Sequence, residues 1–320
     1  MKKVFLTREL PPKAMEKLRA HVDLEMNIED RVLRKDEIIA GVKGKDALLC
    51  LLTDDIDGEV MDANPNLKII ANYAVGFNNI DVEAATKRGI PVTNTPGVLT
   101  DTTADTAFSL ILAGARRVVE ADSFARTGRW MGWGPLQYLG KDVWGATLGI
   151  IGLGRIGKEV VQGSRGFKMK TVYWNRTRLS AEEEKELGVE YMSLEDVLRT
   201  ADFISIHVAY NSETHHLINA RSFELMKEDA YLINTARGPI VDEKALVYAL
   251  EQGQLAGAGL DVFEQEPFIE PALRKMKQVV LLPHLGSATI ETRTKMGLIA
   301  VENLLAGLRG ERPPNQVNEV

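Results

Sequence analysis

Three side chains in the last third of the chain have the types that acid–base chemistry needs, and each closely follows an apolar run that predicts a β-strand. They are Arg237, Glu266 and His284. Because ligands of parallel sheets bind beyond the carboxyl ends of the strands, we expect the three to share one sheet edge. Beside a nicotinamide they would form a hydride-transfer site: the arginine binds a carboxylate, the histidine exchanges a proton with a hydroxyl oxygen, and the glutamate orients the imidazole. Taken singly, they also fit a surface ion pair, a solvated loop acid and a structural histidine.

An earlier stretch has the spacing of a dinucleotide-binding turn. Gly152, Gly154 and Gly157 follow the apolar residues 148–151 and precede a helix-like run, which places G-x-G-x-x-G between a strand and a helix. The first glycine permits the turn, the second lets the backbone approach a pyrophosphate, and the third lets the helix pack on the strand. The residues expected to form this pyrophosphate loop are Gly152, Leu153, Gly154, Arg155, Ile156 and Gly157. The alternative is a structural turn without a ligand.

The end of the next predicted strand, residues 170–174, bears on the choice between NAD and NADP. NAD sites usually place Asp or Glu there to hold the ribose 2′-hydroxyl. Here the strand is followed by Asn175, Arg176 and Thr177, with no carboxylate. Arg176 can pair with a 2′-phosphate, and its two neighbours can hydrogen-bond the phosphate without charge repulsion. We therefore expect NADP(H) to be preferred, with NAD(H) as a second cofactor; the alternative is a solvated loop.

Two blocks of alternating strand-like and helix-like segments would position these residues. In the first block, strands are predicted at residues 3–7, 22–26, 47–52, 67–73 and 90–93, and helices at 11–20, 35–41 and 81–88. In the second block, strands are predicted at residues 147–151, 170–174, 202–206, 230–234, 255–260 and 279–282, and helices at 155–164, 181–187, 194–200, 220–225 and 242–252. Each block predicts a doubly wound α/β domain with a parallel sheet.

A final helical segment, residues 288–308, has no place in the second block, so we expect it to cross back to the first. The predicted architecture is a Rossmann cofactor domain, residues 100–287, inserted in a flavodoxin-like substrate domain. That substrate domain would be discontinuous, comprising residues 1–99 and 288–320, with a cleft between the two domains.

A long helical pattern is predicted over residues 100–127. Between residues 104 and 115 it is apolar on nearly every face, so we expect a domain or subunit interface to bury it. The aromatic and glycine-rich residues 126–145 follow. They fit either a loop packed by its own aromatic side chains or an arm that reaches a neighbouring subunit.

The composition narrows the class of protein. The 320 residues carry a net charge of -6, which gives no reason to expect a nucleic acid or an anionic membrane as partner. Cys50, the only cysteine, lies in an apolar run, which indicates a buried thiol and agrees with a reducing, cytoplasmic location. We expect neither a signal peptide nor a membrane span, and we find no metal-ligand spacing.

Taken together, the motifs resemble those of the D-isomer-specific 2-hydroxyacid dehydrogenases over essentially the whole chain. The stretches that carry this resemblance are residues 152–157, 234–238, 259–267 and 283–287. Within the family, the chain resembles the glyoxylate/hydroxypyruvate reductases through residues 72–81, 98–104 and 130–140. The resemblance implies reduction of a small 2-keto acid, such as glyoxylate or hydroxypyruvate, to the D-2-hydroxy acid with NAD(P)H. The resemblance also implies a homodimer. The implied reaction requires no metal, because the nicotinamide carries the redox chemistry.

The resemblance further implies roles for individual residues. His284 would be the general acid, Glu266 its orienting partner, and Arg237 the group that binds the substrate carboxylate. The residues expected to contact substrate are Val75, Gly76, Trp133, Arg237 and Ser287, with Trp133 coming from a neighbouring subunit. Besides the glycine loop and residues 175–177, those expected to contact the cofactor are Thr103, Thr235, Ala236, Asp261, His284 and Gly286, with Asp261 holding the nicotinamide carboxamide.

Two alternatives stay open at this point. The first keeps the family and changes the substrate to 3-phosphoglycerate, D-lactate, formate or phosphite. The second is a non-catalytic, cofactor-sensing binding protein, because the family includes transcriptional corepressors of this fold. Detectable turnover would separate an enzyme from a binding protein.

Overall fold

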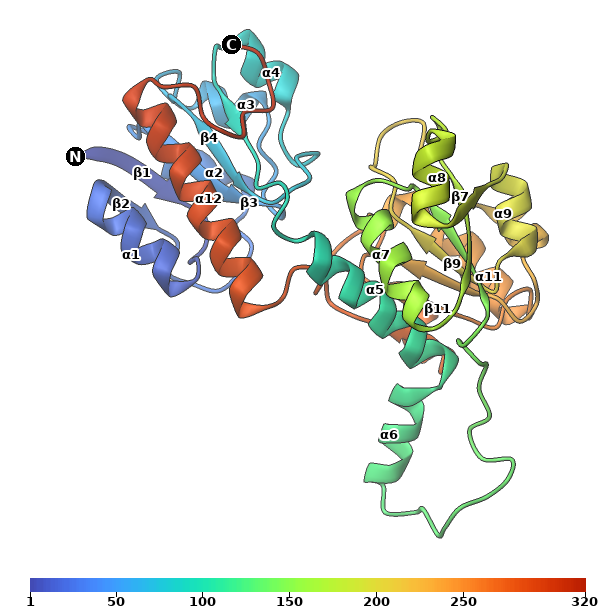
Figure 1. Ribbon diagram of the computed structural model, residues 1–320. Coiled ribbons are helices and arrows are strands. Elements are labelled where there is room, and N and C mark those ends of the chain that lie inside the picture. The colour runs from blue at the N-terminus through green and yellow to red at the C-terminus, as the bar shows by residue number, and fades with distance from the viewer. The chain divides into compact units, whose positions relative to one another are not determined.

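The computed structural model describes residues 1–320, which divide into two compact units (Figure 1). One unit comprises Met1–Leu99 with Ala288–Val320, and the other comprises Thr100–Ser287. Each unit is an α/β structure built on one parallel sheet. The predicted fold class, two doubly wound parallel-sheet units, is therefore confirmed. None of the helices combines the length and the apolar character needed to cross a membrane.

The first unit has five strands in the order β2-β1-β3-β4-β5, which is the flavodoxin-like order. The strands are β1 (Lys2–Leu6), β2 (Val22–Met26), β3 (Ala47–Leu51), β4 (Ile70–Tyr73) and β5 (Val92–Thr93). The helices are α1 (Pro12–His21), α2 (Lys35–Val42), α3 (Gly58–Asp62), α4 (Val82–Lys87) and α12 (Ile290–Arg309). The short helix α3 was not predicted from the sequence; Asp57 caps its first turn by accepting the backbone N–H groups of Glu59 and Val60.

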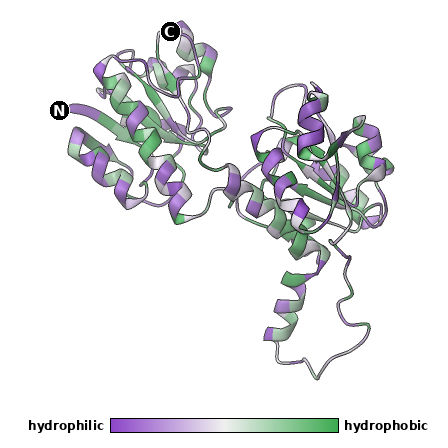
Figure 2. Ribbon diagram, in the orientation of Figure 1, coloured by the Kyte–Doolittle hydropathy of each residue, from purple (hydrophilic) through white to green (hydrophobic).

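Helices cover both faces of this sheet, which explains the continuous apolar run of its central strand β3. The helix α12 packs against α1, β3 and β4, so the last long helix of the chain completes the first unit. Cys50 lies in β3 with no exposed surface, and burial raises the pKa of its thiol. In Figure 2 the outer helices carry both hydrophilic and hydrophobic residues, as expected for helices with one buried face.

The second unit has seven strands in the order β12-β11-β10-β9-β6-β7-β8. The strands are β6 (Thr147–Ile151), β7 (Lys170–Trp174), β8 (Val189–Tyr191), β9 (Phe203–Ile206), β10 (Tyr231–Asn234), β11 (Gly257–Leu260) and β12 (Val279–Leu281). The α-helices are α5 (Thr100–Ala115), α6 (Val118–Arg126), α7 (Arg155–Gly166), α8 (Ala181–Leu187), α9 (Leu194–Thr200), α10 (Ala220–Leu225) and α11 (Glu243–Glu251). The chain reverses direction across the sheet between β6 and β9, which is the Rossmann switch point where dinucleotides bind.

The predicted helix over residues 100–127 is wrong in one respect, because it is broken into α5 and α6. Arg117 adopts a left-handed conformation with φ 52°, and the N–H group of Lys141 donates to the carbonyl of Ala115 at 2.9 Å. The apolar face of α5 packs on α7, β10 and β11, so its own unit buries it. Beyond Ala115 there is no sheet to pack on, and α6 has no buried residue.

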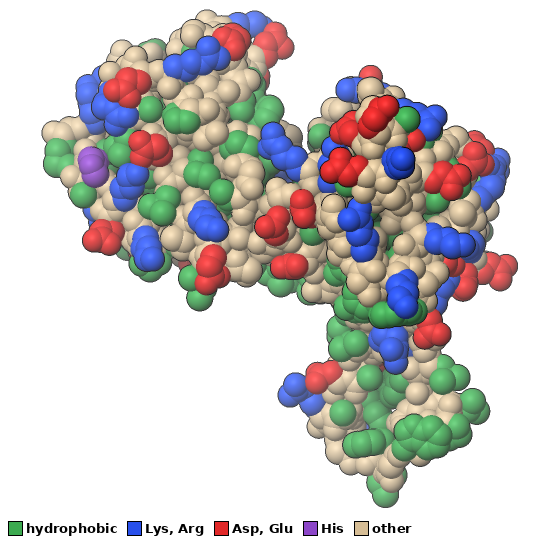
Figure 3. Space-filling model, in the orientation of Figure 1, with side chains coloured by type: hydrophobic (Ala, Val, Ile, Leu, Met, Phe, Trp, Pro, Cys, Tyr) green, Lys and Arg blue, Asp and Glu red, His purple; other side chains and the backbone are tan.

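The segment that follows α6, residues 127–145, is packed by its own aromatic side chains only in part, through Tyr138, whose ring lies 5.4 Å from that of Phe124 in α6. Trp130, Met131 and Trp133 are 58%, 95% and 85% exposed. Figure 1 shows α6 and this segment projecting from the sheet of the second unit, and Figure 3 shows apolar side chains gathered on the projection. We call residues 118–145 the arm. That it reaches a neighbouring subunit stays a prediction.

Candidate active site and nucleotide-binding loop

A hydrogen bond at the carboxyl edge of the second sheet joins His284 to Glu266. His284, after β12, lies with Nδ1 2.8 Å from Oε2 of Glu266, and the other carboxylate oxygen accepts the N–H group of Phe263 at 3.1 Å. Burial opposes ionisation of Glu266, but the hydrogen bond and charge of His284 outweigh it and lower the pKa of the carboxyl group. An ionised carboxylate only accepts hydrogen bonds, so Nδ1 carries the hydrogen and Nε2 is left to exchange a proton with a ligand.

The turn that carries His284 is held by Asp261, which follows β11 and is 1% exposed. Its two carboxylate oxygens accept the N–H groups of Leu285 at 2.6 Å and Gly286 at 2.8 Å. Thr103 of α5 donates its hydroxyl to the carbonyl of Gly286 at 3.1 Å. These bonds fix the left-handed backbone of His284, with φ 56°. Sequence reasoning assigned Asp261 only a cofactor contact and missed that it braces the histidine turn.

Arg237 follows β10 in a loop that packs very closely on the loop carrying Glu266. A Cβ atom on Gly238 would lie 1.9 Å from the carbonyl carbon of Phe263, so only glycine allows this approach. As a result the charges of Arg237 and Glu266 interact. Burial lowers the pKa of the Arg237 guanidinium and the charge of Glu266 partly opposes this, so the group stays a cation. The structure therefore brings Arg237, Glu266 and His284 together, as their places after three neighbouring strands predict.

Thr235 and Ala236 lie at the same carboxyl end of β10. Asn234 braces them: its side-chain oxygen accepts the N–H group of Ala236 at 3.0 Å and its amide donates to the carbonyl of Arg237 at 2.9 Å. The hydroxyl of Thr235 is buried and has no hydrogen-bond partner in the protein. A buried hydroxyl without a partner is costly unless a ligand supplies one. Thr235 thus fits its predicted role as a cofactor contact.

The glycine turn between β6 and α7 has the geometry that a dinucleotide requires. Gly152 has φ 100°, and a Cβ atom there would lie 2.5 Å from the nitrogen of Val208. A Cβ atom on Gly157 would lie 2.4 Å from the carbonyl oxygen of Gly152, whereas one on Gly154 would meet nothing within 4 Å. The first and third glycines therefore serve packing, and the second faces open space. A pyrophosphate fits there against the first N–H groups of α7.

The three residues after β7 have different surroundings. Asn175 turns back, and its side-chain oxygen accepts the N–H group of Leu153 in the glycine turn at 2.6 Å. Arg176 donates from Nη1 to Oε2 of Glu213 at 2.7 Å, and both side chains are largely exposed. Thr177 is exposed. Glu213 lies in the loop after β9, and sequence reasoning missed it because nothing in the sequence places it beside Arg176.

In the first unit, Val75 and Gly76 lie in the loop that follows β4. The side chain of Asn94 donates to the carbonyl of Val75 at 2.8 Å, and the side chain of Asn72 donates to the carbonyl of Gly76 at 2.9 Å. Asn72 is fully buried, so the loop is anchored from inside the sheet. With both carbonyls bound to side chains of the protein, the peptide planes of this loop have a fixed orientation.

A second histidine–carboxylate pair lies outside the predicted site. His216 approaches Oε1 of Glu264 with Nε2 at 2.9 Å, and its ring stacks on that of His215 at a centroid distance of 4.0 Å. Glu264 in turn accepts the N–H group of Glu243 at 3.3 Å and donates its own N–H to Glu243 at 2.6 Å. These bonds hold the loop after β11, and no group of three His, Cys, Asp or Glu side chains is placed to hold a metal ion.

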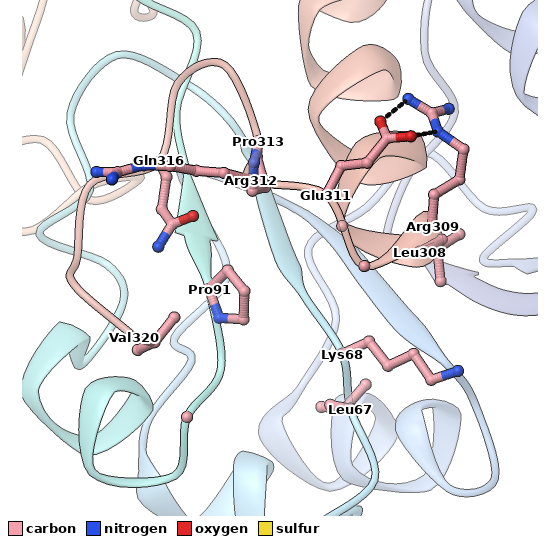
Figure 4. A pocket seen from close by; sticks show the side chains of 13 residues that line it. Leu67, Lys68, Pro91, Leu308, Arg309, Glu311, Arg312, Pro313, Gln316 and Val320 are labelled. Atoms are coloured by element: carbon pink, nitrogen blue, oxygen red, sulfur yellow. Dashed lines mark hydrogen bonds and ion pairs between the residues drawn. The ribbon is translucent and has the colours of Figure 1, made fainter.

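A hollow of about 700 Å³ in the first unit is not a candidate for the same site (Figure 4). Lys68 and Pro91, which line it, precede β4 and β5, so the hollow lies at the amino edge of the sheet, opposite the edge where ligands of such sheets bind. Its cationic side chains already have carboxylate partners: Arg309 pairs with Glu311 and Arg312 pairs with Glu319.

Comparisons with known proteins give consistent results. Residues 108–286 match the model of the D-isomer specific 2-hydroxyacid dehydrogenase NAD binding domain. A glyoxylate reductase of Korarchaeum cryptofilum is 52% identical over 99% of this chain and 96% of its own. The crystal structure of the TT0316 protein of Thermus thermophilus is 46% identical and superposes with a TM-score of 0.92, covering 99% of this chain and 100% of its own. An NADPH-dependent glyoxylate/hydroxypyruvate reductase of Sinorhizobium meliloti is 34% identical, with a TM-score of 0.86 over 99% of this chain and 98% of its own.

Proposed function

The chain belongs to the D-isomer specific 2-hydroxyacid dehydrogenase family, and from this premise we propose that it reduces glyoxylate or hydroxypyruvate to the D-2-hydroxy acid with NADPH as the favoured reductant. Membership makes the protein an NAD(P)-dependent oxidoreductase. The substrate is inferred from relatives named glyoxylate reductase, and the roles of individual residues are inferred from geometry.

The observation that carries the proposal is the bonded pair His284–Glu266 with Arg237 next to it. A 2-keto acid presents a carboxylate and a carbonyl on adjacent carbons. The planar guanidinium of Arg237 can bind the carboxylate through two parallel hydrogen bonds and meet the carbonyl oxygen from the same side. A proton donor and a cation within one cluster match the two polar groups of such a substrate.

When bound, the reduced nicotinamide supplies the hydride. The residues of the chain do the rest: Arg237 orients the keto acid, and His284 donates the proton from Nε2 to the substrate oxygen as that oxygen gains negative charge. Glu266 keeps the imidazole in the required orientation by accepting the hydrogen of Nδ1. Val75, Gly76, Ser287 and Trp133 complete the substrate contacts.

We assign the cofactor contacts to residues whose geometry fits the group. The open face of Gly154 and the N-terminus of α7 would receive the pyrophosphate, and the unpartnered hydroxyl of Thr235 would bond the ligand at the end of β10. The remaining proposed contacts are Thr103, Leu153, Arg155, Ile156, Ala236, Asp261 and Gly286. Asn175, Arg176 and Thr177 would surround the 2′-phosphate of NADP(H).

The proposed assembly is a homodimer formed through the arm. Trp133 is 85% exposed and Leu136 is 81% exposed, which supports their burial against a second copy of the chain. Replacing Trp130 and Trp133 with serine should weaken dimerisation by about tenfold or more for each tryptophan, the scale of an aromatic hot spot. Sedimentation equilibrium of the wild-type and variant proteins measures this, and an unchanged monomer–dimer equilibrium would remove the arm from the interface.

The experiment that tests the reaction is the rate of NADPH consumption by the purified protein with glyoxylate or hydroxypyruvate, run beside NADH. We expect rapid turnover that requires the keto acid and is faster with NADPH at low cofactor concentration. Folded protein that turns over neither keto acid with either cofactor would refute the proposed substrate. Phosphohydroxypyruvate and pyruvate, tested in parallel, would then identify a different member of the keto-acid class.

A further inference from the structure

We propose that Glu213 sets the balance between NADPH and NADH by competing with the 2′-phosphate for Arg176. The inference rests on the proposed function, because it concerns the cofactor end of the same site. The residues that follow β7 include no carboxylate to determine cofactor specificity. The fold supplies one, Glu213, from the loop after β9.

The geometry gives Glu213 a defined position. Its backbone N–H group donates to the side chain of Asn211 at 2.9 Å, and Asn211 also accepts the N–H group of Thr214 at 3.1 Å. The hydroxyl of Thr214 donates to the carbonyl of Ala209 at 2.8 Å. This turn presents the carboxylate of Glu213 to Arg176, where the two side chains meet at 2.7 Å.

Arg176 is the cation that a ligand can recruit, and Arg178 is not. Arg178 makes two hydrogen bonds of 2.8 Å to Glu184, whose carboxylate also accepts the hydroxyl of the buried Tyr173 at 2.7 Å. Removing Arg178 from this cluster would leave a poorly solvated carboxylate. Arg176 has one partner, Glu213, in the contacts that the structure gives it, and the pair is 78% and 65% exposed. A pair in water contributes little to folding and opens readily.

The same carboxylate acts in opposite directions on the two cofactors. A 2′-phosphate brings about two negative charges to Arg176, so it must displace Glu213 and remain near its charge, which weakens NADPH binding. A ribose 2′-hydroxyl can instead donate a hydrogen bond to a carboxylate, which is the usual way that NAD is recognised. Glu213 thus opposes NADPH binding and supports NADH binding, whereas Arg176 supports NADPH binding.

The test is the affinity of each nucleotide for the intact protein, measured by calorimetry without any keto acid. We expect Glu213→Gln to raise the ratio of NADPH to NADH affinity by about threefold to tenfold, the effect of removing one charge near a solvated phosphate. The same substitution should favour adenosine 2′,5′-bisphosphate over 5′-AMP. The gain should shrink as the salt concentration rises.

The matched control is Glu224→Gln, which removes an exposed glutamate paired with Arg221 on α10 and not among the proposed nucleotide contacts. It should leave both affinities unchanged. If Glu213→Gln leaves the ratio within twofold of wild type, or moves it toward NADH, the inference is wrong while dinucleotide binding by the wild type still supports the proposed function. If the wild type binds neither NADPH nor NADH, both fall.

Discussion

The carboxyl edge of the second sheet carries two polar clusters that are built in opposite ways. Around His284, Asp261 is buried and the side chain of Glu266 is 28% exposed, and each of their carboxylate oxygens has a hydrogen-bond donor. Around Arg176, an exposed guanidinium meets an exposed carboxylate, and neither touches the core. The first cluster is already organised before any ligand arrives, whereas the second can exchange its partner.

This difference separates two properties that the family must control. Proton transfer needs groups held in one geometry in a poorly solvated place, where a change of one residue leaves a buried charge or donor without a partner. Recognition of a ribose substituent needs only charge near the right atom, and an exposed ion pair contributes about 0–1 kcal/mol to folding. Cofactor choice can therefore change with little loss of stability, but the catalytic cluster cannot.

The largest expected effect comes from removing the proton donor. His284→Ala should lower kcat by about two to four orders of magnitude, the usual range for a general acid, and change NADPH affinity much less. Steady-state kinetics and NADPH titration measure the two quantities, with the exposed His21→Ala as the control. Near-normal kcat would remove His284 from this role and make the two clusters alike.

Arg237→Lys is expected to come next. Lysine keeps the charge but loses the paired hydrogen bonds, so kcat/KM for the keto acid should fall about tenfold to a hundredfold, the scale of one or two charge-assisted bonds. NADPH affinity should hold, because the guanidinium serves the substrate. Equal losses in cofactor affinity and in kcat/KM would instead mean that Arg237 supports the loop packing around Gly238.

A smaller change is expected at the exposed cluster. Arg176→Ala should weaken NADPH binding by about tenfold and change NADH binding by less than about twofold, because only NADPH carries the 2′-phosphate that the arginine would bond. The thermal midpoint of unfolding should stay close to that of the wild type. An unchanged affinity ratio would refute the 2′-phosphate assignment, and a large loss of stability would contradict the contrast between the clusters.

The last expected effect is on stability and not on activity, and it concerns His207, which follows β9 between the strands of the two clusters. Burial lowers the pKa of His207 from 6.5 to about 4, and its Nε2 lies 2.8 Å from the hydroxyl of Ser205. Below pH 6.5 the imidazole of His207 binds a proton in the unfolded chain, whereas in the folded chain it binds one only near pH 4. The free energy of unfolding should therefore fall by about 1–3 kcal/mol as the pH drops through this interval.

The measurement is denaturant unfolding at about pH 7 and about pH 4.5 for the wild type and for His207→Gln, which cannot titrate. Carboxylates that titrate in both proteins cancel in the comparison. Between the two pH values the wild type should lose more stability than His207→Gln, whatever constant difference the substitution causes at about pH 7. An equal loss of unfolding free energy in both proteins would show that the fold does not keep His207 neutral.

A feature of the fold or the site could be predicted from the sequence where it depends on residues close together in the chain. The strand β6 and the glycine turn are local, because a buried strand reads as an apolar run and the spacing of Gly152 and Gly157 follows from contacts within one turn. Arg237, Glu266 and His284 were predictable as a group because three parallel strands deliver their ends to one edge.

The remaining features depend on contacts distant in sequence. The break at Arg117 was not predictable, because Val118 and Val119 continue the apolar pattern and only the end of the sheet shows that nothing covers them. Glu213 stands 37 residues from Arg176, and no periodicity joins them. The brace from Asp261 to the histidine turn depends in the same way on how far β11 and β12 extend.

The single thiol of the chain, Cys50, can report how often the first unit opens. Thiol reagents attack an ionised, accessible sulfur, and Cys50 in the middle of the first sheet is neither. Labelling must therefore wait for that sheet to open, and its rate reports the frequency of opening. Because the second unit contains no cysteine, opening of the nucleotide-binding unit does not change the rate of thiol labelling. A reagent added to the native protein would time the opening of one half of the molecule without a probe having to be introduced.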